Sequence, residues 1–126
     1  MPAIRPLRIL LAEDNPVNQL MVIRLMEKQG HTVTVAANGE QAISAFGRDT
    51  FDVVLMDVQM PELDGLEATR MIRASEQVTG CHTPIIAVTA LAMTGDAEKC
   101  LKAGMDAYIA KPIKVTELFL KIQQLV

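Results

Sequence analysis

Residues Val53-Val54-Leu55-Met56 form an uninterrupted apolar run, and Asp57 follows it directly. A strand that is buried on both faces has this pattern, whereas a half-exposed strand alternates apolar and polar residues. Comparable short runs recur along the chain, at residues 8–12, 32–36, 51–56, 84–88 and 107–110. These runs predict strands, and the continuous ones indicate a parallel sheet covered by helices on both faces.

Helical patterns fill the segments between the runs. The first begins at Asn15-Pro16, a good N-cap followed by proline at the first helical position, and extends to about Gln29. It has one broad apolar stripe, formed by Val17, Leu20, Met21, Leu25 and Met26. Further helices are predicted at about residues 40–46, 66–75, 97–103 and 116–125. Five consecutive βα units predict an α/β fold with an open, doubly wound sheet.

Composition limits the kinds of function. The chain has 126 residues, half of them apolar, so we expect one domain spanning residues 1–126. A net charge of −3, no basic run and few aromatic residues argue against direct nucleic-acid binding. Its apolar runs are too short for a signal peptide or a membrane span, so no direct membrane contact is expected. Cys81 and Cys100, without a C-x-x-C motif, suggest reduced thiols in the cytoplasm.

Polar residues follow the predicted strands at equivalent places. Glu13 and Asp14 follow the first run, Asp57 the third, Thr89 the fourth and Lys111 the fifth. In an open parallel sheet the carboxyl ends of the strands meet at one edge, and ligands bind there. The sequence therefore predicts three carboxylates, a hydroxyl and an ammonium group around a single site.

The charges of this predicted site indicate its chemistry. Two carboxylates about 4 Å apart repel by roughly 4 kcal/mol at an effective dielectric constant near 20. Either a pKa rises or a cation binds, and an all-oxygen ligand set suits Mg²⁺. A metal ion, an ammonium and a hydroxyl around one aspartate describe a site for phosphoryl transfer onto that carboxylate.

Simpler explanations exist for single residues. Glu13 or Asp14 alone could cap the first helix, Lys111 could form a plain ion pair with Asp57, and Thr89 could be an ordinary strand residue. His31 and His82 have no metal-ligand partner at suitable spacing, so both are predicted to be surface residues.

The chain resembles a two-component response-regulator receiver domain over nearly all of residues 8–125. The resemblance rests on five motifs in this order and spacing: Glu13-Asp14-Asn15, Leu55-Met56-Asp57-Val58-Gln59-Met60-Pro61, Asp64-Gly65, Thr89-Ala90 and Lys111-Pro112. Residues 13–19, 56–65, 87–93 and 100–106 are most similar to receivers of hybrid sensor histidine kinases. The resemblance implies a flavodoxin-like (βα)5 fold, with a five-stranded parallel sheet in the order 2-1-3-4-5.

The resemblance also implies a metal site and a phosphoacceptor. Asp57 is the phosphoacceptor, and Asp14, Asp57 and the backbone carbonyl of Gln59 bind Mg²⁺. Glu13 holds a water molecule on the metal.

Further roles follow from the same resemblance. Lys111 and the Thr89 hydroxyl bind phosphoryl oxygens, Lys111-Pro112 is a cis peptide, and Thr89 and Tyr108 form the conformational switch. The implied donor is the phosphohistidine of a histidine kinase, of a histidine-phosphotransfer domain, or of both. The expected location is the cytoplasm, either free or tethered to a membrane sensor kinase.

Alternative functions are a stand-alone response regulator, a receiver-like module that no longer phosphorylates, and an aspartate-nucleophile phosphatase. Such a phosphatase needs a general acid two residues after the nucleophile, where this chain has Gln59, and an amide cannot supply that proton. Both Asp57 and Lys111 are present, which argues against an inactive module. The expected catalysis is limited to the domain's own phosphorylation and dephosphorylation, although a hybrid parent protein would itself be a kinase.

Overall fold

The computed structural model describes residues 6–58, 64–89, 94–110 and 113–126, which form alternating strands and helices. The elements, in chain order, are β1 (Arg8–Ala12), α1 (Pro16–Lys28), β2 (Thr32–Ala36), α2 (Gly39–Arg48), β3 (Val53–Asp57), α3 (Gly65–Thr79), β4 (Ile85–Thr89), α4 (Thr94–Ala103), β5 (Ala107–Ala110) and α5 (Val115–Leu125). None of the described helices is both long and apolar enough to cross a membrane.

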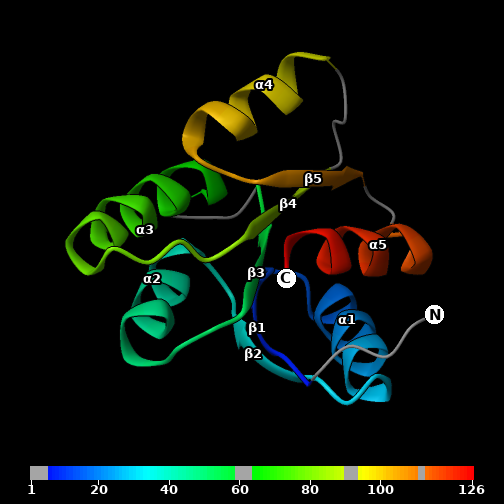
Figure 1. Ribbon diagram of the computed structural model, residues 1–126. Helices are drawn as coiled ribbons and strands as arrows, with labels where there is room; N and C mark the ends of the chain where they lie inside the picture. The colour runs from blue at the N-terminus through cyan, green and yellow to red at the C-terminus, as the bar shows by residue number, and fades with distance from the viewer. Residues whose placement is uncertain (1–5, 59–63, 90–93, 111–112) are drawn as a thin grey trace.

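The five strands form one parallel sheet in the order β2-β1-β3-β4-β5. Helices α1 and α5 cover one face, and α2, α3 and α4 cover the other (Figure 1). The predicted α/β fold and its strand order are confirmed. In this arrangement β1 and β3 are central, while β2 and β5 are the two edge strands.

Alternate residues of the central strands enter two separate cores. Ile9 and Leu11 pack with Val22 and Ile122 on the side of α1 and α5. Leu10 packs on the opposite side, with residues of α2, α3 and α4. Since successive side chains of a strand point to opposite faces, a strand between two helical layers must be apolar at every position. This explains why Val53-Val54-Leu55-Met56 is uninterrupted.

The third and fourth strands begin and end later than predicted, and their C-terminal ends concern the site. β3 begins at Val53 rather than at residue 51 and includes Asp57, while β4 ends at Thr89 rather than at residue 88. The backbone ladder continues through these polar residues because Asp57 pairs with Val88 and Thr89 with Ala110. The sheet therefore fixes the backbone from which their side chains project.

Helix α3 extends four residues beyond the predicted end and stops at Gly80, whose φ of 77° is left-handed. Tertiary contacts support this last turn. Glu76 is buried, and its carboxylate accepts hydrogen bonds from the Arg73 guanidinium and from the amide of Thr83. Arg73 also bonds to Asp106 and to the carbonyl of Gly104, across the α4–β5 turn. Polar side chains near the end of α3 thus hold the helix against its neighbours.

Two predictions about burial were wrong. The first concerns three of the five residues in the apolar stripe of the first helix, since Leu25 and Met26 of that stripe do pack in the core. Val17, Leu20 and Met21 are exposed, whereas Val22 and Met26 are buried against the sheet.

The second concerns His31, which is buried rather than on the surface. Its Nδ1 accepts a hydrogen bond from the amide of Leu7 at 3.0 Å. Burial lowers the pKa of His31 below its usual value, and the carboxylate of Asp52 partly opposes this effect. His82 is exposed as predicted and lies 2.7 Å from a carboxylate oxygen of Asp106.

Gly65 allows α3 to begin directly against the end of β3. A Cβ atom added at this position would lie 2.2 Å from the carbonyl oxygen of Asp57, which is backbone and cannot rotate away. The amide of Gly65 donates to the carbonyl of Val58, and Asp64 caps the helix by accepting from the amide of Glu67. Glycine is therefore required here for close packing and not for an unusual φ angle.

We expect Gly65→Ala to lower the free energy of unfolding by roughly 1–3 kcal/mol, because strand and helix must separate to admit the methyl group. Gly47→Ala is the matched control. Gly47 also lies in a helix, but nothing is within 4 Å of its added Cβ. The control should stabilise the protein by up to about 1 kcal/mol through helix propensity. Urea titrations of both variants measure the difference, and equal effects would contradict the close-packing explanation.

Candidate functional site

The carboxyl ends of β1, β3 and β4 meet at one edge of the sheet, and each presents a polar side chain there. Ala12 pairs with Met56, so Glu13 and Asp57 follow at equivalent positions on neighbouring strands. Asp57 in turn pairs with Val88, directly before Thr89. The topology therefore places residues that are far apart in the sequence around one site.

Three carboxylates gather at this edge. One oxygen from each of Glu13, Asp14 and Asp57 lies within 4.8 Å of the others. Asp57 is 1% exposed and Glu13 is 3% exposed, while Asp14 faces solvent. At this separation two ionised carboxylates repel by roughly 3 kcal/mol at an effective dielectric constant of about 20. Three hard oxygen donors, two of them buried and one exposed, fit the ligands that a hydrated Mg²⁺ ion prefers.

The backbone around Glu13 is tightly held. Its amide donates to the carbonyl of Ala36, its Oε2 accepts from the amide of Asn15 at 3.1 Å, and its carbonyl accepts from the side chain of Gln19 at 2.6 Å. Sequence reasoning missed Gln19, because a glutamine in the first turns of a helix is ordinarily solvated. This hydrogen bond joins α1 to the loop that carries Glu13 and Asp14.

The N-cap of α1 is Asn15, as predicted. Its Oδ1 accepts hydrogen bonds from the amides of Val17 and Asn18 at 2.8 and 3.2 Å. The helix therefore does not use the Glu13 or Asp14 side chain as its N-cap. Their carboxylates remain grouped with Asp57, which removes the simplest structural explanation for the two acids.

Thr89 and Tyr108 lie on the strands beyond Asp57. Thr89 is buried at the end of β4 and pairs with Ala110 of β5. Tyr108 pairs with Ala87, two residues before Thr89, and is 37% exposed. Its neighbours Ala107 and Ile109 pack into the core beside α1 and α5, so Tyr108 projects from the other face of β5, the side of α4.

The remaining predicted site residues, Gln59 and Lys111, lie outside the described residues, as does the Lys111-Pro112 bond. Their predicted roles stay predictions. Glu13, Asp14, Asp57 and Thr89 are brought to one edge by the fold.

The similarity of this chain to known proteins is consistent with an acidic site at the carboxyl ends of the strands. Residues 9–123 match the model of the response regulator receiver domain. The chain belongs to this receiver family. Among curated proteins it is similar to hybrid signal transduction histidine kinase I of Dictyostelium discoideum, with 46% identity. That match covers 90% of the chain but only 7% of the kinase, so the chain corresponds to a small part of that relative.

Solved structures include close neighbours of this receiver. One is the receiver domain of the sensor histidine kinase PA1611 from Pseudomonas aeruginosa PAO1, which has a magnesium ion coordinated in its active-site cleft. It is 47% identical with a TM-score of 0.86, covering 95% of this chain and 97% of that one. Another is the receiver of Ssk1 in complex with the phosphotransfer protein Ypd1 from Saccharomyces cerevisiae. It is 29% identical with a TM-score of 0.91, covering 95% of this chain and 88% of that one.

Because the three carboxylates repel one another, we expect Mg²⁺ to stabilise the fold. A ligand present at about 100 times its dissociation constant adds about 2.7 kcal/mol to the free energy of unfolding. Asp14→Asn should lose most of this gain and should melt no lower than the wild type without metal, since one repelling charge is gone. Thermal melts with Mg²⁺ and with a chelator measure both effects.

Asp64→Asn is the control for this experiment, because it removes an equal charge outside the cluster and asparagine still caps a helix. It should keep the full response to Mg²⁺. An equal Mg²⁺ response in Asp14→Asn and in the wild type would place the metal elsewhere.

Proposed function

We propose that the chain is the phosphoacceptor of a two-component phosphorelay, in which Asp57 receives a phosphoryl group from a phosphohistidine. The observation that supports this most directly is the burial of Asp57 at the end of β3, with Glu13 and Asp14 beside it. A buried carboxylate among like charges is costly for a purely structural residue. The electrostatic cost of burying Asp57 is explained if its carboxylate is a nucleophile that acts together with a divalent cation.

The proposed step forms one bond and breaks another. An oxygen of Asp57 attacks phosphorus, the phosphorus–nitrogen bond to the donor histidine breaks, and the imidazole leaves with the bonding electrons. When bound, Mg²⁺ supplies positive charge that offsets the charge on the phosphoryl oxygens. Asp14 and Asp57 would hold the cation and Glu13 would hold a water molecule on it. The Thr89 hydroxyl, one residue after the Val88 that pairs with Asp57, would donate to a phosphoryl oxygen. Lys111 is proposed to bind another oxygen by its resemblance to the family.

The hybrid-kinase context is favoured over a stand-alone regulator by similarity to hybrid histidine kinases at 46% and 43% identity. A phosphatase is disfavoured because Gln59 occupies the position of the required general acid. Under this proposal the domain changes only its own phosphorylation state, and any kinase activity belongs to other parts of a longer protein.

The experiment that tests the proposal is phosphorylation by acetyl phosphate. With Mg²⁺, the wild type should gain one phosphoryl group by intact mass, and a chelator should prevent it. Asp57→Asn should abolish labelling while the protein stays folded, since removing one of three repelling charges favours the fold. Asp64→Asn should label normally. Phosphate that maps to another residue would refute the assignment.

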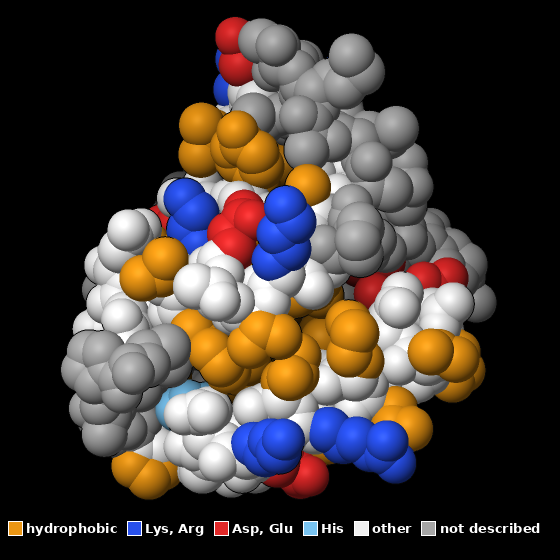
Figure 2. Space-filling view, turned by 90° about the vertical axis from the view of Figure 1, so that its right-hand side faces the viewer, with side chains coloured by type: hydrophobic (Ala, Val, Ile, Leu, Met, Phe, Trp, Pro, Cys, Tyr) orange, Lys and Arg blue, Asp and Glu red, His pale blue; other side chains and the backbone are white. Residues whose placement is uncertain are grey.

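We further propose that the phosphohistidine donor docks on α1. This helix begins at Pro16, two residues after Asp14 of the acidic cluster. Val17 is 75% exposed, Leu20 48% and Met21 37%, and this apolar surface takes no part in either core. Figure 2 shows hydrophobic side chains among Lys and Arg side chains on the side of the molecule where α1 and α5 run. The relative Ssk1 was solved in complex with a phosphotransfer protein, which supports a partner of that class.

Leu20→Asp should therefore slow phosphotransfer from a phosphorylated histidine-phosphotransfer domain by about tenfold, the loss typical of a central contact residue. Labelling by acetyl phosphate should not change, because that small donor needs no docking surface. Leu120→Asp is the matched control, since Leu120 of α5 is 49% exposed and lies on a different helix. Equal slowing by both substitutions would contradict docking on α1.

Thr89 and Tyr108 are proposed to report phosphorylation to the surface. A phosphoryl group on Asp57 needs hydrogen-bond donors, and movement of the Thr89 hydroxyl toward it would shift β4 against β5, where Tyr108 lies two pairs away. The phosphate stabilises one arrangement through contacts that the other lacks.

In Thr89→Ala, beryllium fluoride should bind at Asp57 but leave the amide chemical shifts of residues 107–110 close to those of the free protein. Thr89→Ser keeps the hydroxyl and should restore the shifts. A full response in Thr89→Ala would show that the switch does not depend on this hydroxyl.

A further inference from the structure

The outer edge of β2 leaves backbone hydrogen-bonding groups without a strand partner. Within the described part of the chain, β2 is at the end of the sheet and pairs only with β1. The amide of Thr32 donates to Leu7 and the carbonyl of Ala36 accepts from Glu13, so residues 32 and 36 face β1. Because these directions alternate along a strand, the amides and carbonyls of Val33 and Val35 point away from the sheet.

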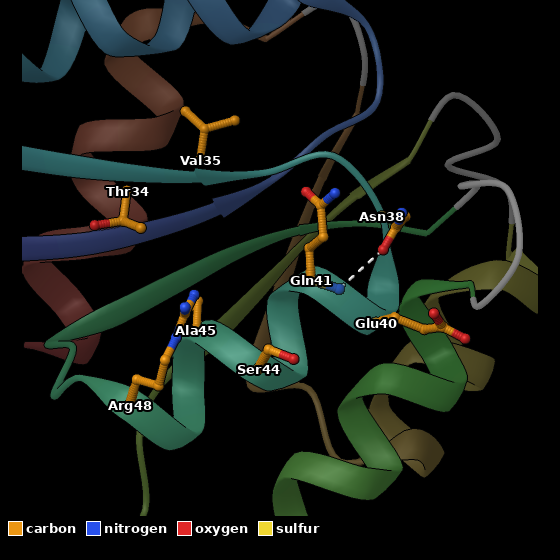
Figure 3. Close-up of a pocket in the computed structure, with 8 residues that line it drawn as sticks. All are labelled: Thr34, Val35, Asn38, Glu40, Gln41, Ser44, Ala45 and Arg48. Atoms are coloured by element: carbon orange, nitrogen blue, oxygen red, sulfur yellow. Dashed lines mark hydrogen bonds between the residues drawn. The ribbon is translucent and has the colours of Figure 1, made fainter.

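Nothing in the sequence of β2 protects this edge. The strand reads Thr-Val-Thr-Val-Ala, and it has no proline and no charged residue, the features that usually prevent edge-to-edge pairing. Val35 is 36% exposed. Beside the strand is a groove formed with α2, and it is lined by Thr34, Val35, Asn38, Glu40, Gln41, Ser44, Ala45 and Arg48 (Figure 3).

The two ends of this groove have opposite charges. Glu40 lies in the first turn of α2, next to the C-terminal end of β2, and Arg48 lies in the last turn, toward the N-terminal end of the strand (Figure 3). Both side chains are exposed. Neither has an ion pair or a side-chain hydrogen bond with any part of the chain that the structure describes. The groove thus offers one exposed charge of each sign, separated along the strand.

We propose that two copies of this chain associate through their β2 edges, in an antiparallel arrangement with a two-fold axis at Thr34. In this register Val33 of one copy lies opposite Val35 of the other. Both have outward amides and carbonyls, so each such pair exchanges two hydrogen bonds. Thr34 then lies opposite Thr34 as a close, non-hydrogen-bonded pair, and threonine pairs at such positions are favourable.

The positions of Glu40 and Arg48 favour a second copy of this chain as the partner over an unrelated extended peptide. An antiparallel arrangement brings the N-terminal end of one β2 to the C-terminal end of the other. Arg48 of each copy therefore faces Glu40 of the other copy, and the contact occurs twice because of the symmetry. A parallel arrangement would bring arginine to arginine and glutamate to glutamate. The groove is thus self-complementary in backbone and charge, and the interface uses the outer edge of β2 and the charged ends of α2 rather than Asp57 or the exposed face of α1.

The test uses charge reversals and sedimentation velocity over a concentration series. The wild type should show a reversible monomer–dimer equilibrium that weakens as salt is added. Arg48→Glu places like charges at both symmetric contacts, as does Glu40→Arg, and each should raise the dimer dissociation constant by about tenfold. The double variant R48E/E40R should dimerise like the wild type, because it restores both pairs in reverse.

Mixing the two single variants provides the decisive measurement. In a mixed dimer, the carboxylate introduced by R48E in one copy faces the guanidinium introduced by E40R in the other. The remaining contact pairs the native Glu40 with the native Arg48. The mixture should therefore form heterodimers at concentrations where neither variant dimerises alone. Thermal melts confirm that the variants are folded, and hydrogen exchange should show concentration-dependent protection of the Val33 and Val35 amides but not of the Thr34 amide.

Three results would overturn the proposal. The first is a wild type that remains monomeric up to millimolar concentration. The second is dimerisation that both single variants retain, which would indicate a different surface. The third is the loss of dimerisation in both variants without recovery on mixing, which would indicate that the charges do not face each other. Asp57→Asn should dimerise like the wild type, so the outcome is separate from that of the phosphorylation experiment.

Discussion

Mutual repulsion among Glu13, Asp14 and Asp57 is the constraint on which the rest of the structure depends. A fold that places three carboxylate oxygens within 4.8 Å of one another must hold their backbone firmly, since the side chains themselves favour separation. The parallel sheet does this because the acids follow strands that are buried on both faces. Apolar burial of those strands offsets the electrostatic cost at their ends, and the remaining repulsion suits the cluster to a divalent cation.

Contacts from α1 and α3 reinforce the carboxyl end of the sheet, where the acidic residues lie. Gly65 brings the start of α3 against the carbonyl of Asp57, and no larger residue fits between them. On the other side of Asp57, Gln19 of α1 holds the carbonyl of Glu13. Both contacts fix backbone rather than carboxylate groups. The acidic side chains can therefore respond to a ligand while the positions from which they project stay constant.

We assign different roles to two surfaces of the described part of the chain, the exposed apolar face of α1 and the outer edge of β2. Helix α1 begins two residues after Asp14, which suits a donor that must bring a phosphohistidine to Asp57. The edge of β2 is a surface with charges at both ends, and it is complementary to itself. A receiver that used both surfaces could accept a phosphoryl group while paired with a second copy, because the two interfaces involve different elements.

The sequence by itself determined the fold class, the approximate strands and the identity of the acidic residues, because buried parallel strands must be apolar throughout and polar residues at their ends are conspicuous. It did not determine features that depend on which neighbour an element meets. Leu20 is exposed although it belongs to an apolar stripe, since the sheet covers only the part of α1 around Val22 and Met26. His31 is buried because its ring accepts the amide of Leu7, a contact 24 residues away in the sequence. The last turn of α3 and the open edge of β2 likewise follow from tertiary placement, because hydrogen bonds from Arg73 and the position of a strand in the sheet are set by distant parts of the chain.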